Sequence, residues 1–343
     1  MRVLITGGAG GVARYQAHTL ARQGFQVDLL DIKNFRQEEY PAGVTRHPGD
    51  LRDHQVLSRL CAGRDAIIYP VALPANQSAA HAAIAETHAL LEAAHQHAVP
   101  RLICISATAV YALPQPAPIT EAAPLSGSGL YGRTCLAVER LCEAYRARGQ
   151  HITILRAPPG VVPDQSEIWT ILFDRVRRGR RIPVIGAGDT RYQMLAGADL
   201  TQAVLLLLTG PSTCTNDTFN IGAQRFGMLR QDLRALCDYA GNGARVLPTP
   251  AGPSRAALRL LAMLRLAPLL TQLYLTSDWN VSVSTAKLEQ VLGWQPRYSN
   301  AEALIHAYQD YLDQDETQPG SGRPTSPSMV DSGLLRCIRR FLV

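Results

Sequence analysis

The chain has 343 residues, of which 46% are hydrophobic and 18% are charged. It is long enough to bury a large core, and this composition excludes a disordered protein. The formal net charge of +6 comes almost entirely from arginine, since Lys33 and Lys287 are the two lysines, and no basic run alternates with aromatic residues, so we expect no nucleic-acid partner.

The cysteines and the apolar segments restrict the cellular setting. The seven cysteines are odd in number and form no Cys-x-x-Cys pair, which favours free thiols in a reducing cytoplasm and argues against disulfides or a metal site. The apolar stretch Val3–Ile5 is too short for a signal peptide. Two arginines and a proline interrupt the leucine-rich segment Ala256–Leu275, so we expect amphipathic helices there and no transmembrane segment.

Short apolar strands alternate with helical stretches through the first half of the chain. This alternation predicts an α/β fold of the Rossmann type, with a doubly wound parallel sheet covered on both faces. The expected strands are Val3–Thr6, Gln26–Asp31, Thr45–His47, Ala66–Tyr69, Leu102–Ser106 and Ile152–Arg156. The expected helices are Val12–Gln23, Arg52–Cys61, Ser78–His97 and Tyr131–Arg148.

The second half is more mixed and predicts a smaller α/β lobe. Asp199 is expected to cap the helix that it begins, and the arginines between Arg175 and Arg181 indicate a solvated helix end, with contact to an anionic substrate as the second interpretation. The elements expected in this lobe are helix Glu167–Arg178, strand Ile182–Ile185, helix Asp199–Leu208, strand Thr218–Ile221, and helices Leu229–Ala240 and Ala256–Leu273.

We therefore divide the chain into a cofactor domain of residues 1–157, a substrate lobe of residues 158–313 from which some segments return to the first domain, and a tail of residues 314–343. From Gln314 to Ser328 the composition shifts to Pro, Gly, Ser and Thr, which is typical of a linker. Met329–Val343 can form a short amphipathic helix. We favour a tail that frays or packs on the main body; docking to a partner or to an anionic membrane surface is the alternative.

A glycine-rich turn follows the first expected strand. Gly7 permits a tight turn, Gly10 lets the backbone approach a pyrophosphate, and the small Ala13 in the third position allows close packing of helix on strand. The pyrophosphate would lie at the helix N-terminus near Gly11 and Val12, where N–H groups and the helix dipole favour negative charge. The sequence thus predicts a dinucleotide site.

An acidic residue at the end of the second strand narrows the choice of dinucleotide. Asp31 lies about 20 residues beyond the glycines, where a carboxylate hydrogen-bonds ribose hydroxyls and repels a 2′-phosphate. We therefore expect NAD as the cofactor. Lys33 and Arg36, a few residues further on, keep NADP open as the less favoured alternative.

These residues resemble the extended short-chain dehydrogenase/reductase family, in its NAD-dependent epimerase/dehydratase type, and the resemblance extends to about Leu312. Asp50 and Leu51 match the family's adenine-contacting segment, and Val71 and Ala72 end a segment similar to its His-Leu-Ala-Ala strand. Further matching segments are 105–111, 118–124, 131–144, 219–222 and 292–296. The resemblance implies a homodimer formed through the helices near Ser78–His97 and Tyr131–Arg148.

The expected catalytic group departs from the family. There, a tyrosine is the general base or acid, a lysine one turn later holds the nicotinamide ribose and lowers the phenol pKa, and a Ser or Thr bonds the reacting oxygen. The matching positions are Tyr131, Cys135 and Ala107. Without the lysine, the Tyr131 phenol should keep a pKa of about 10 and stay protonated at neutral pH. Thr108 is one step from the missing hydroxyl, and on a strand it would face the other way unless the backbone bends.

Two explanations of this departure remain open. Either the protein is an NAD-binding enzyme that acts on a nucleotide sugar or another small hydroxylated metabolite by an atypical route, with neutral Tyr131 as proton donor, or it is a catalytically degenerate regulatory or non-redox protein. A nucleophilic Cys135 is less favoured, because nothing nearby would lower its pKa.

The resemblance also implies a substrate contact. Arg191 lies in a segment similar to the family's loop that meets the diphosphate of a nucleotide sugar, and a planar guanidinium suits a phosphate. A surface ion pair is the equal alternative. Ala196 and Ala198 replace the histidine and acid usual before Asp199-Leu200, so a standard sugar nucleotide cannot be assumed.

Overall fold

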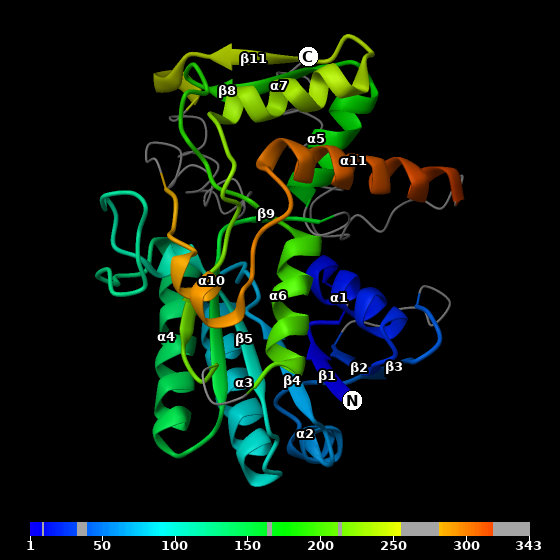
Figure 1. The fold of residues 1–343 in the computed structure, drawn as a ribbon, viewed down its shortest axis with the longest axis vertical. Helices are drawn as coiled ribbons and strands as arrows, with labels where there is room; N and C mark the ends of the chain where they lie inside the picture. The colour runs from blue at the N-terminus through cyan, green and yellow to red at the C-terminus, as the bar shows by residue number, and fades with distance from the viewer. Residues whose placement is uncertain (9, 33–39, 163–166, 212–214, 255–280, 318–343) are drawn as a thin grey trace.

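The computed structural model describes residues 1–8, 10–32, 40–162, 167–211, 215–254 and 281–317. A seven-stranded parallel sheet forms its centre, in the order β10-β6-β5-β4-β1-β2-β3 (Figure 1), which confirms the predicted fold class. The strands are β1 (Arg2–Thr6), β2 (Gln26–Asp31), β3 (Val44–Pro48), β4 (Ala66–Pro70), β5 (Leu102–Ala107), β6 (Ile152–Ala157) and β10 (Thr218–Asn220).

Helices cover both faces of this sheet because its strands are apolar on both sides. On one face α1 (Gly11–Arg22) and α6 (Gly197–Thr209) pack on side chains such as Val3 and Ile5 of β1. Leu4 of the same strand points to the opposite face, as the alternation of a strand requires. The helices on that face are α2 (His54–Cys61), α3 (Gln77–Gln96) and α4 (Gly129–Ala147).

A smaller group of elements lies beyond the carboxyl ends of the strands (Figure 1). A separate apolar core, which includes Phe173 and Tyr308, joins its helices. The elements are α5 (Glu167–Arg177), α7 (Leu229–Ala240) and α11 (Asn300–Thr317), with the parallel pairs β8 (Arg181–Ile185) with β11 (Arg245–Thr249) and β7 (Gly160–Val161) with β9 (Leu195–Ala196). α10 (Ala286–Leu292) lies against β10.

Several expectations for the second half were wrong or incomplete. Helix α11 continues to Thr317, past Gln314, where a linker was expected to begin. Asp199 does not cap α6, which begins at Gly197; its buried carboxylate instead accepts the backbone N–H groups of Arg297 and Tyr298 at 2.9 and 3.2 Å. The elements α10, α11, β7, β9 and β11 were not predicted.

Two predicted segments, Ala256–Leu273 and the C-terminal helix Met329–Val343, lie outside the described residues. Within the part of the chain that is described, no helix combines the length and apolar character needed to cross a membrane.

Candidate functional site: a dinucleotide cradle beside a buried tyrosine–cysteine pair

The turn between β1 and α1 has the backbone that its glycines predict. Gly7 has a φ of +66°, a value that side chains disfavour, and the Gly10 N–H donates to the Gly7 carbonyl at 2.8 Å. A Cβ on Gly10 would lie 3.2 Å from that carbonyl oxygen. The N-cap residue of α1 is Gly10, which has no side chain to cap the helix, and the first turn of α1 carries no acid. This end of the helix therefore fits a pyrophosphate.

Loops from adjacent strands flank this turn. β1 lies between β4 and β2, and parallel strands end at the same edge, where ligands of such sheets bind. Asp31 ends β2, and its carbonyl accepts the Gly49 N–H at 2.9 Å, which ties the two loops together. The expected cofactor residues at this edge are Gly7, Gly10, Gly11, Val12, Asp31, Asp50, Leu51, Val71 and Ala72.

Asp50 and Leu51 lie in the loop after β3. Hydrogen bonds from Arg52, at distances from 2.5 to 3.1 Å, hold the pKa of the Asp50 carboxyl below its usual range. The Leu51 side chain packs against the apolar core on the α3 side of the sheet. Lys33 and Arg36, on which the NADP alternative depends, lie outside the described residues.

Tyr131 lies in the first turn of α4 and reaches back to the same edge. The residue as a whole is half-buried, and its hydroxyl donates to the Val71 carbonyl at 3.5 Å. Burial, followed by the neighbouring Cys135, raises the pKa of the Tyr131 phenol well above its ordinary value. The expected pKa of about 10 was therefore too low. The expectation took account of the missing positive charge but not of burial, which further favours the protonated phenol.

Cys135 occupies the position of the absent lysine and has no exposed surface. Burial raises the pKa of its thiol to about 12, although hydrogen bonds with Tyr131, with Ser106 and with the backbone of Ala107 lower it. A neutral thiol in an apolar setting is a poor nucleophile. Ala107 is 6% exposed, so the position where the family carries a hydroxyl holds a buried methyl group.

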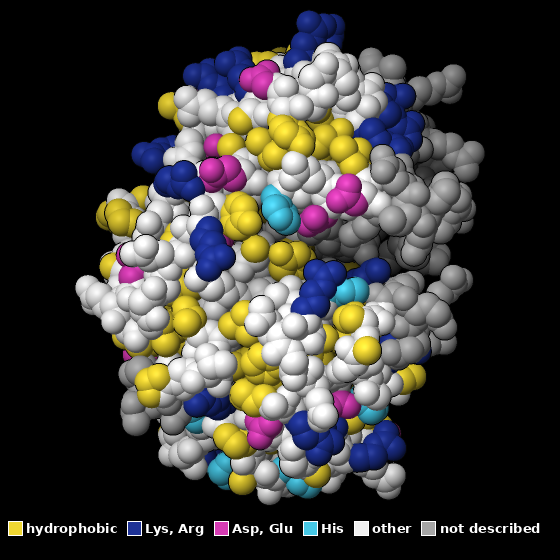
Figure 2. All heavy atoms as spheres, turned by 45° about the vertical axis from the view of Figure 1, so that its right-hand side comes forward, with side chains coloured by type: hydrophobic (Ala, Val, Ile, Leu, Met, Phe, Trp, Pro, Cys, Tyr) yellow, Lys and Arg dark blue, Asp and Glu magenta, His cyan; other side chains and the backbone are white. Residues whose placement is uncertain are grey.

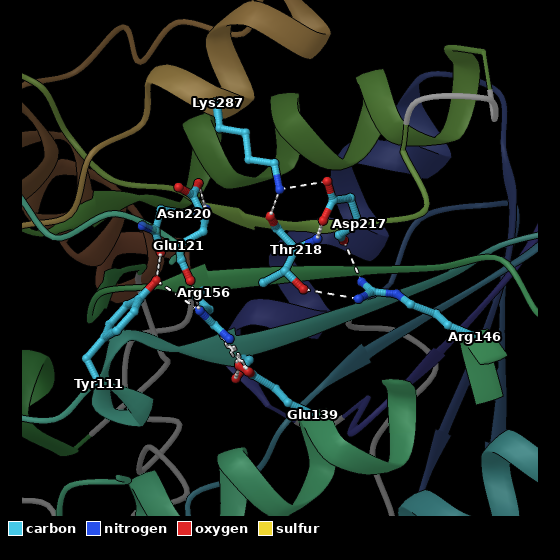
Figure 3. Close-up of polar contacts among 10 residues, drawn as sticks. Tyr111, Glu121, Glu139, Arg146, Arg156, Asp217, Thr218, Asn220 and Lys287 are labelled. Carbon is cyan, nitrogen blue, oxygen red and sulfur yellow. Dashed lines mark hydrogen bonds and ion pairs between the residues drawn. The ribbon is translucent and has the colours of Figure 1, made fainter. Parts of the chain in front are cut away.

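Ser106 and Glu139 act on the Cys135 thiol, and both belong to a polar network that the sequence did not predict. Figure 3 shows Glu139 and Arg156 of this network. The Ser106 hydroxyl donates to Glu139 at 2.5 Å, and Arg156 donates to both Glu139 carboxylate oxygens, the shortest bond being 2.8 Å. Arg156 also donates to the Tyr111 hydroxyl at 3.1 Å. Glu139 follows Tyr131 by eight residues and Cys135 by four, so its helical spacing could have indicated a shared face.

Two other cations, Lys287 and Arg156, do not replace the missing lysine beside Tyr131. The described lysine, Lys287, forms an ion pair with Asp217 at 2.6 Å and donates to the Thr218 carbonyl at 2.9 Å (Figure 3). Arg156 is held by Glu139. Both cations are therefore held in ion pairs within the fold.

Thr108 does not extend β5, because the strand ends at Ala107 and Thr108 begins a short 3-10 helix to Val110. The threonine is 9% exposed. This 3-10 helix lies against the start of α4: a Cβ on Gly132 would stand 2.3 Å from the Ala109 carbonyl oxygen. The bend that could redirect Thr108 is present, and it also fixes the backbone beside Tyr131.

Arg191, the expected substrate contact, lies on the second lobe. Its guanidinium is 5.2 Å from the centre of the Phe226 ring and donates to the Phe226 carbonyl at 3.3 Å. The side chain is exposed. Figure 2 shows Lys and Arg side chains on the outer surface of the molecule. On α5, Arg178 pairs with Asp174 at 2.9 Å, in keeping with a solvated helix end.

Comparison with known proteins places this geometry in a family. The model of the NAD dependent epimerase/dehydratase family matches residues 3–222. The chain belongs to this family. NAD, the cofactor expected from the sequence, is the one in the family's description.

Three relatives illustrate the likeness. An uncharacterised protein of Sinorhizobium fredii is 29% identical over 319 residues, which cover 90% of this chain and 78% of that protein. The dTDP-glucose 4,6-dehydratase of Streptomyces niveus is 25% identical over 340 residues, or 91% of this chain and 93% of the enzyme. The crystal structure of UDP-glucose 4-epimerase from Thermotoga maritima superposes with a TM-score of 0.75 at 20% identity, covering 92% of this chain and all of that one.

Proposed function

We propose that this protein is an NAD-dependent enzyme that acts on a nucleotide sugar or a similar small hydroxylated metabolite, by a mechanism that uses neither a lysine nor a Ser/Thr hydroxyl at the usual positions. The observation that carries the proposal is the glycine turn before α1, with Asp31 at the end of the neighbouring strand. Relatives of the chain include a dTDP-glucose 4,6-dehydratase and a UDP-glucose 4-epimerase, which supports the substrate class.

Each part of the cofactor has a proposed partner at the carboxyl edge of the sheet. The turn from Gly7 and Gly10 into Gly11 and Val12 would hold the pyrophosphate. Asp31 would bind the adenosine ribose hydroxyls, which favours NAD over NADP. Adenine would lie against Asp50 and Leu51, and the nicotinamide end against Val71 and Ala72. Bound there, NAD supplies the acceptance and donation of a hydride.

In this proposal Tyr131 holds a proton at its phenolic oxygen beside the nicotinamide end, while Cys135 supports the ring and adds no charge. Thr108 is the weaker candidate for a hydroxyl near the reacting oxygen. Arg191, which already stacks on Phe226, is the proposed contact for the substrate's phosphates.

The assembly and setting are also proposals. The resemblance supports a homodimer through α3 and α4, which pack side by side. Free thiols support a cytoplasmic location, since the five described cysteines are all buried and unbridged. We keep the division into a cofactor domain of residues 1–157, a substrate lobe of residues 158–313 and a tail, with docking of the tail to a partner or membrane surface as its alternative role.

Calorimetry with NAD⁺, NADH and NADPH tests the proposal. We expect NAD⁺ and NADH to bind, NADPH to bind more weakly, and Gly10→Val to abolish binding because its side chain fills the phosphate cradle. Asp31→Asn should narrow the preference for NADH over NADPH, whereas Asp189→Asn, at an exposed carboxylate paired with Arg230, should leave it unchanged. Absence of heat with every dinucleotide refutes the proposal. Binding without turnover of any nucleotide sugar supports the degenerate alternative.

A further inference from the structure

The surroundings of Tyr131 hold its proton in place. The phenol donates to the Val71 carbonyl, an acceptor that binds O–H and repels a phenolate. The groups with the largest influence on it are Cys135 of its own helix, Cys104 of β5 and Tyr69 of β4. All three are buried, and none carries a positive charge. Among the described residues, the groups that act most on Tyr131 therefore favour the protonated phenol, which can release its proton to a stronger base, and they supply no charge that would stabilise a phenolate.

Removal of a hydride from an alcohol needs the opposite property. The alcohol must lose its hydroxyl proton to a base as its carbon loses the hydride, and a tyrosine serves as that base only when it is ionised. A cation within about 4–6 Å makes ionisation possible at neutral pH. At position 135 this chain has a thiol with no exposed surface instead.

From this geometry we infer that the enzyme acts on a carbonyl compound, a nucleotide-linked keto sugar, and reduces it to an alcohol, with Tyr131 as the proton donor. The inference deepens the proposed function and rests on it for the cofactor. It separates this chain from the relatives named above, because a 4-epimerase or a 4,6-dehydratase begins by oxidising a hydroxyl group of its nucleotide sugar.

The step balances in atoms and electrons. The carbonyl carbon gains a hydride, with its electron pair, from a reduced nicotinamide dinucleotide, which is thereby oxidised. The carbonyl oxygen gains the Tyr131 proton, so a C–H and an O–H bond form as the C=O π bond and the tyrosine O–H bond break. The half-buried phenol then regains its proton from solvent water. The substrate must be supplied by a reaction that creates a sugar ketone, by oxidation or by loss of water.

The direct test is a pair of pH profiles on the full-length protein. With NADH and a nucleoside-diphosphate 4-keto-6-deoxysugar, we expect kcat/KM for reduction to stay flat between about pH 6 and 9. With NAD⁺ and UDP-glucose, any oxidation should rise about tenfold per pH unit through this range, since below a pKa of about 10 the phenolate fraction does so. Oxidation that levels off near neutral pH and is abolished by Tyr131→Phe would overturn the inference.

A second measurement needs no turnover. The ultraviolet absorbance of tyrosinate, taken as the difference between the wild-type protein and Tyr131→Phe, should show no ionisation of Tyr131 below about pH 10. Cys135→Lys should lower this transition by about 1–3 pH units, because an adjacent cation stabilises the phenolate. Cys135→Met, which has similar length and no charge, should not lower it. Circular dichroism first confirms that both variants fold.

The outcomes separate this inference from the proposed function. If dinucleotides bind but the wild-type difference titration shows tyrosinate at neutral pH, the inference fails and the cofactor proposal stands. If no dinucleotide binds, the cofactor proposal fails, and the titration still reports whether Tyr131 is held as an acid.

Discussion

Arg156→Met is the most informative perturbation of the fold behind the candidate site. Glu139 is 1% exposed and Arg156 is 3% exposed. Burial alone lowers the pKa of Arg156, but the hydrogen bonds and charges of Glu139 and Tyr111 together more than offset this, so that the net shift is upward. Methionine has a similar length and removes the charge together with every bond to Glu139. Loss of one partner of a buried ion pair costs about 3–5 kcal/mol, and we expect unfolding free energy to fall by that amount.

Urea unfolding followed by far-ultraviolet circular dichroism measures this loss. The matched control is Arg225→Met, which breaks an ion pair with Glu302 whose side chains are 63% and 50% exposed; exposed pairs contribute less than about 1 kcal/mol. The double variant Arg156→Met/Glu139→Leu should recover most of the stability, because no buried charge remains unpaired. If Arg156→Met costs no more than its control, the network is not the stabilising element that we describe.

Two further predictions concern α4 and its neighbour α3. Gly132→Ala places a methyl group 2.3 Å from the Ala109 carbonyl oxygen, so it should cost about 1–3 kcal/mol in urea unfolding and reduce turnover by displacing Tyr131; unchanged stability and turnover would show that the close approach is not needed. Hydrogen bonds, from Tyr145 first, lower the pKa of Glu92 from 4.5 to about 2. A depressed folded-state pKa gives stability that is complete above about pH 4.5 and is lost as the pH falls towards 2. Tyr145→Phe should therefore reduce the drop in melting temperature between pH 6 and pH 3, and an equal drop in both proteins would contradict this assignment.

Much of the first domain could be predicted because its sequence pattern and its packing agree. Apolar runs such as Leu102–Ser106 became strands with nearly the predicted bounds, since β5 spans Leu102–Ala107 and strands buried on both faces leave largely apolar segments. In the second lobe this rule fails. β7 and β9 have two residues each, and they exist only because Gly160 and Leu195 meet across a long connection. β11 contains Pro248, which argues against a strand in a local reading.

The candidate site likewise has features that the sequence could predict and one that it could not. The glycine turn and Asp31 could be predicted, because local backbone geometry and a fixed distance along the chain define them. The pKa of Tyr131 could not, because it depends on burial and on groups from two other segments, Tyr69 of β4 and Cys104 of β5. Desolvation is a property of the assembled core, and no spacing in the sequence measures it.

The structure also bears on the choice between an enzyme with an altered mechanism and a catalytically degenerate protein. Glycine in a helix costs about 1 kcal/mol relative to alanine, yet Gly132 stands in the first turn of α4, where only the absence of a Cβ lets the helix approach Ala109. That approach sets the backbone of Tyr131, and the Val71 carbonyl receives its hydroxyl. The position and orientation of the phenol are thus specified at a cost, while the single cation that would ionise it is replaced by Cys135. Such a pattern alters the proton chemistry of the site and leaves its geometry in place, as expected of an enzyme that needs an acid there and not a base.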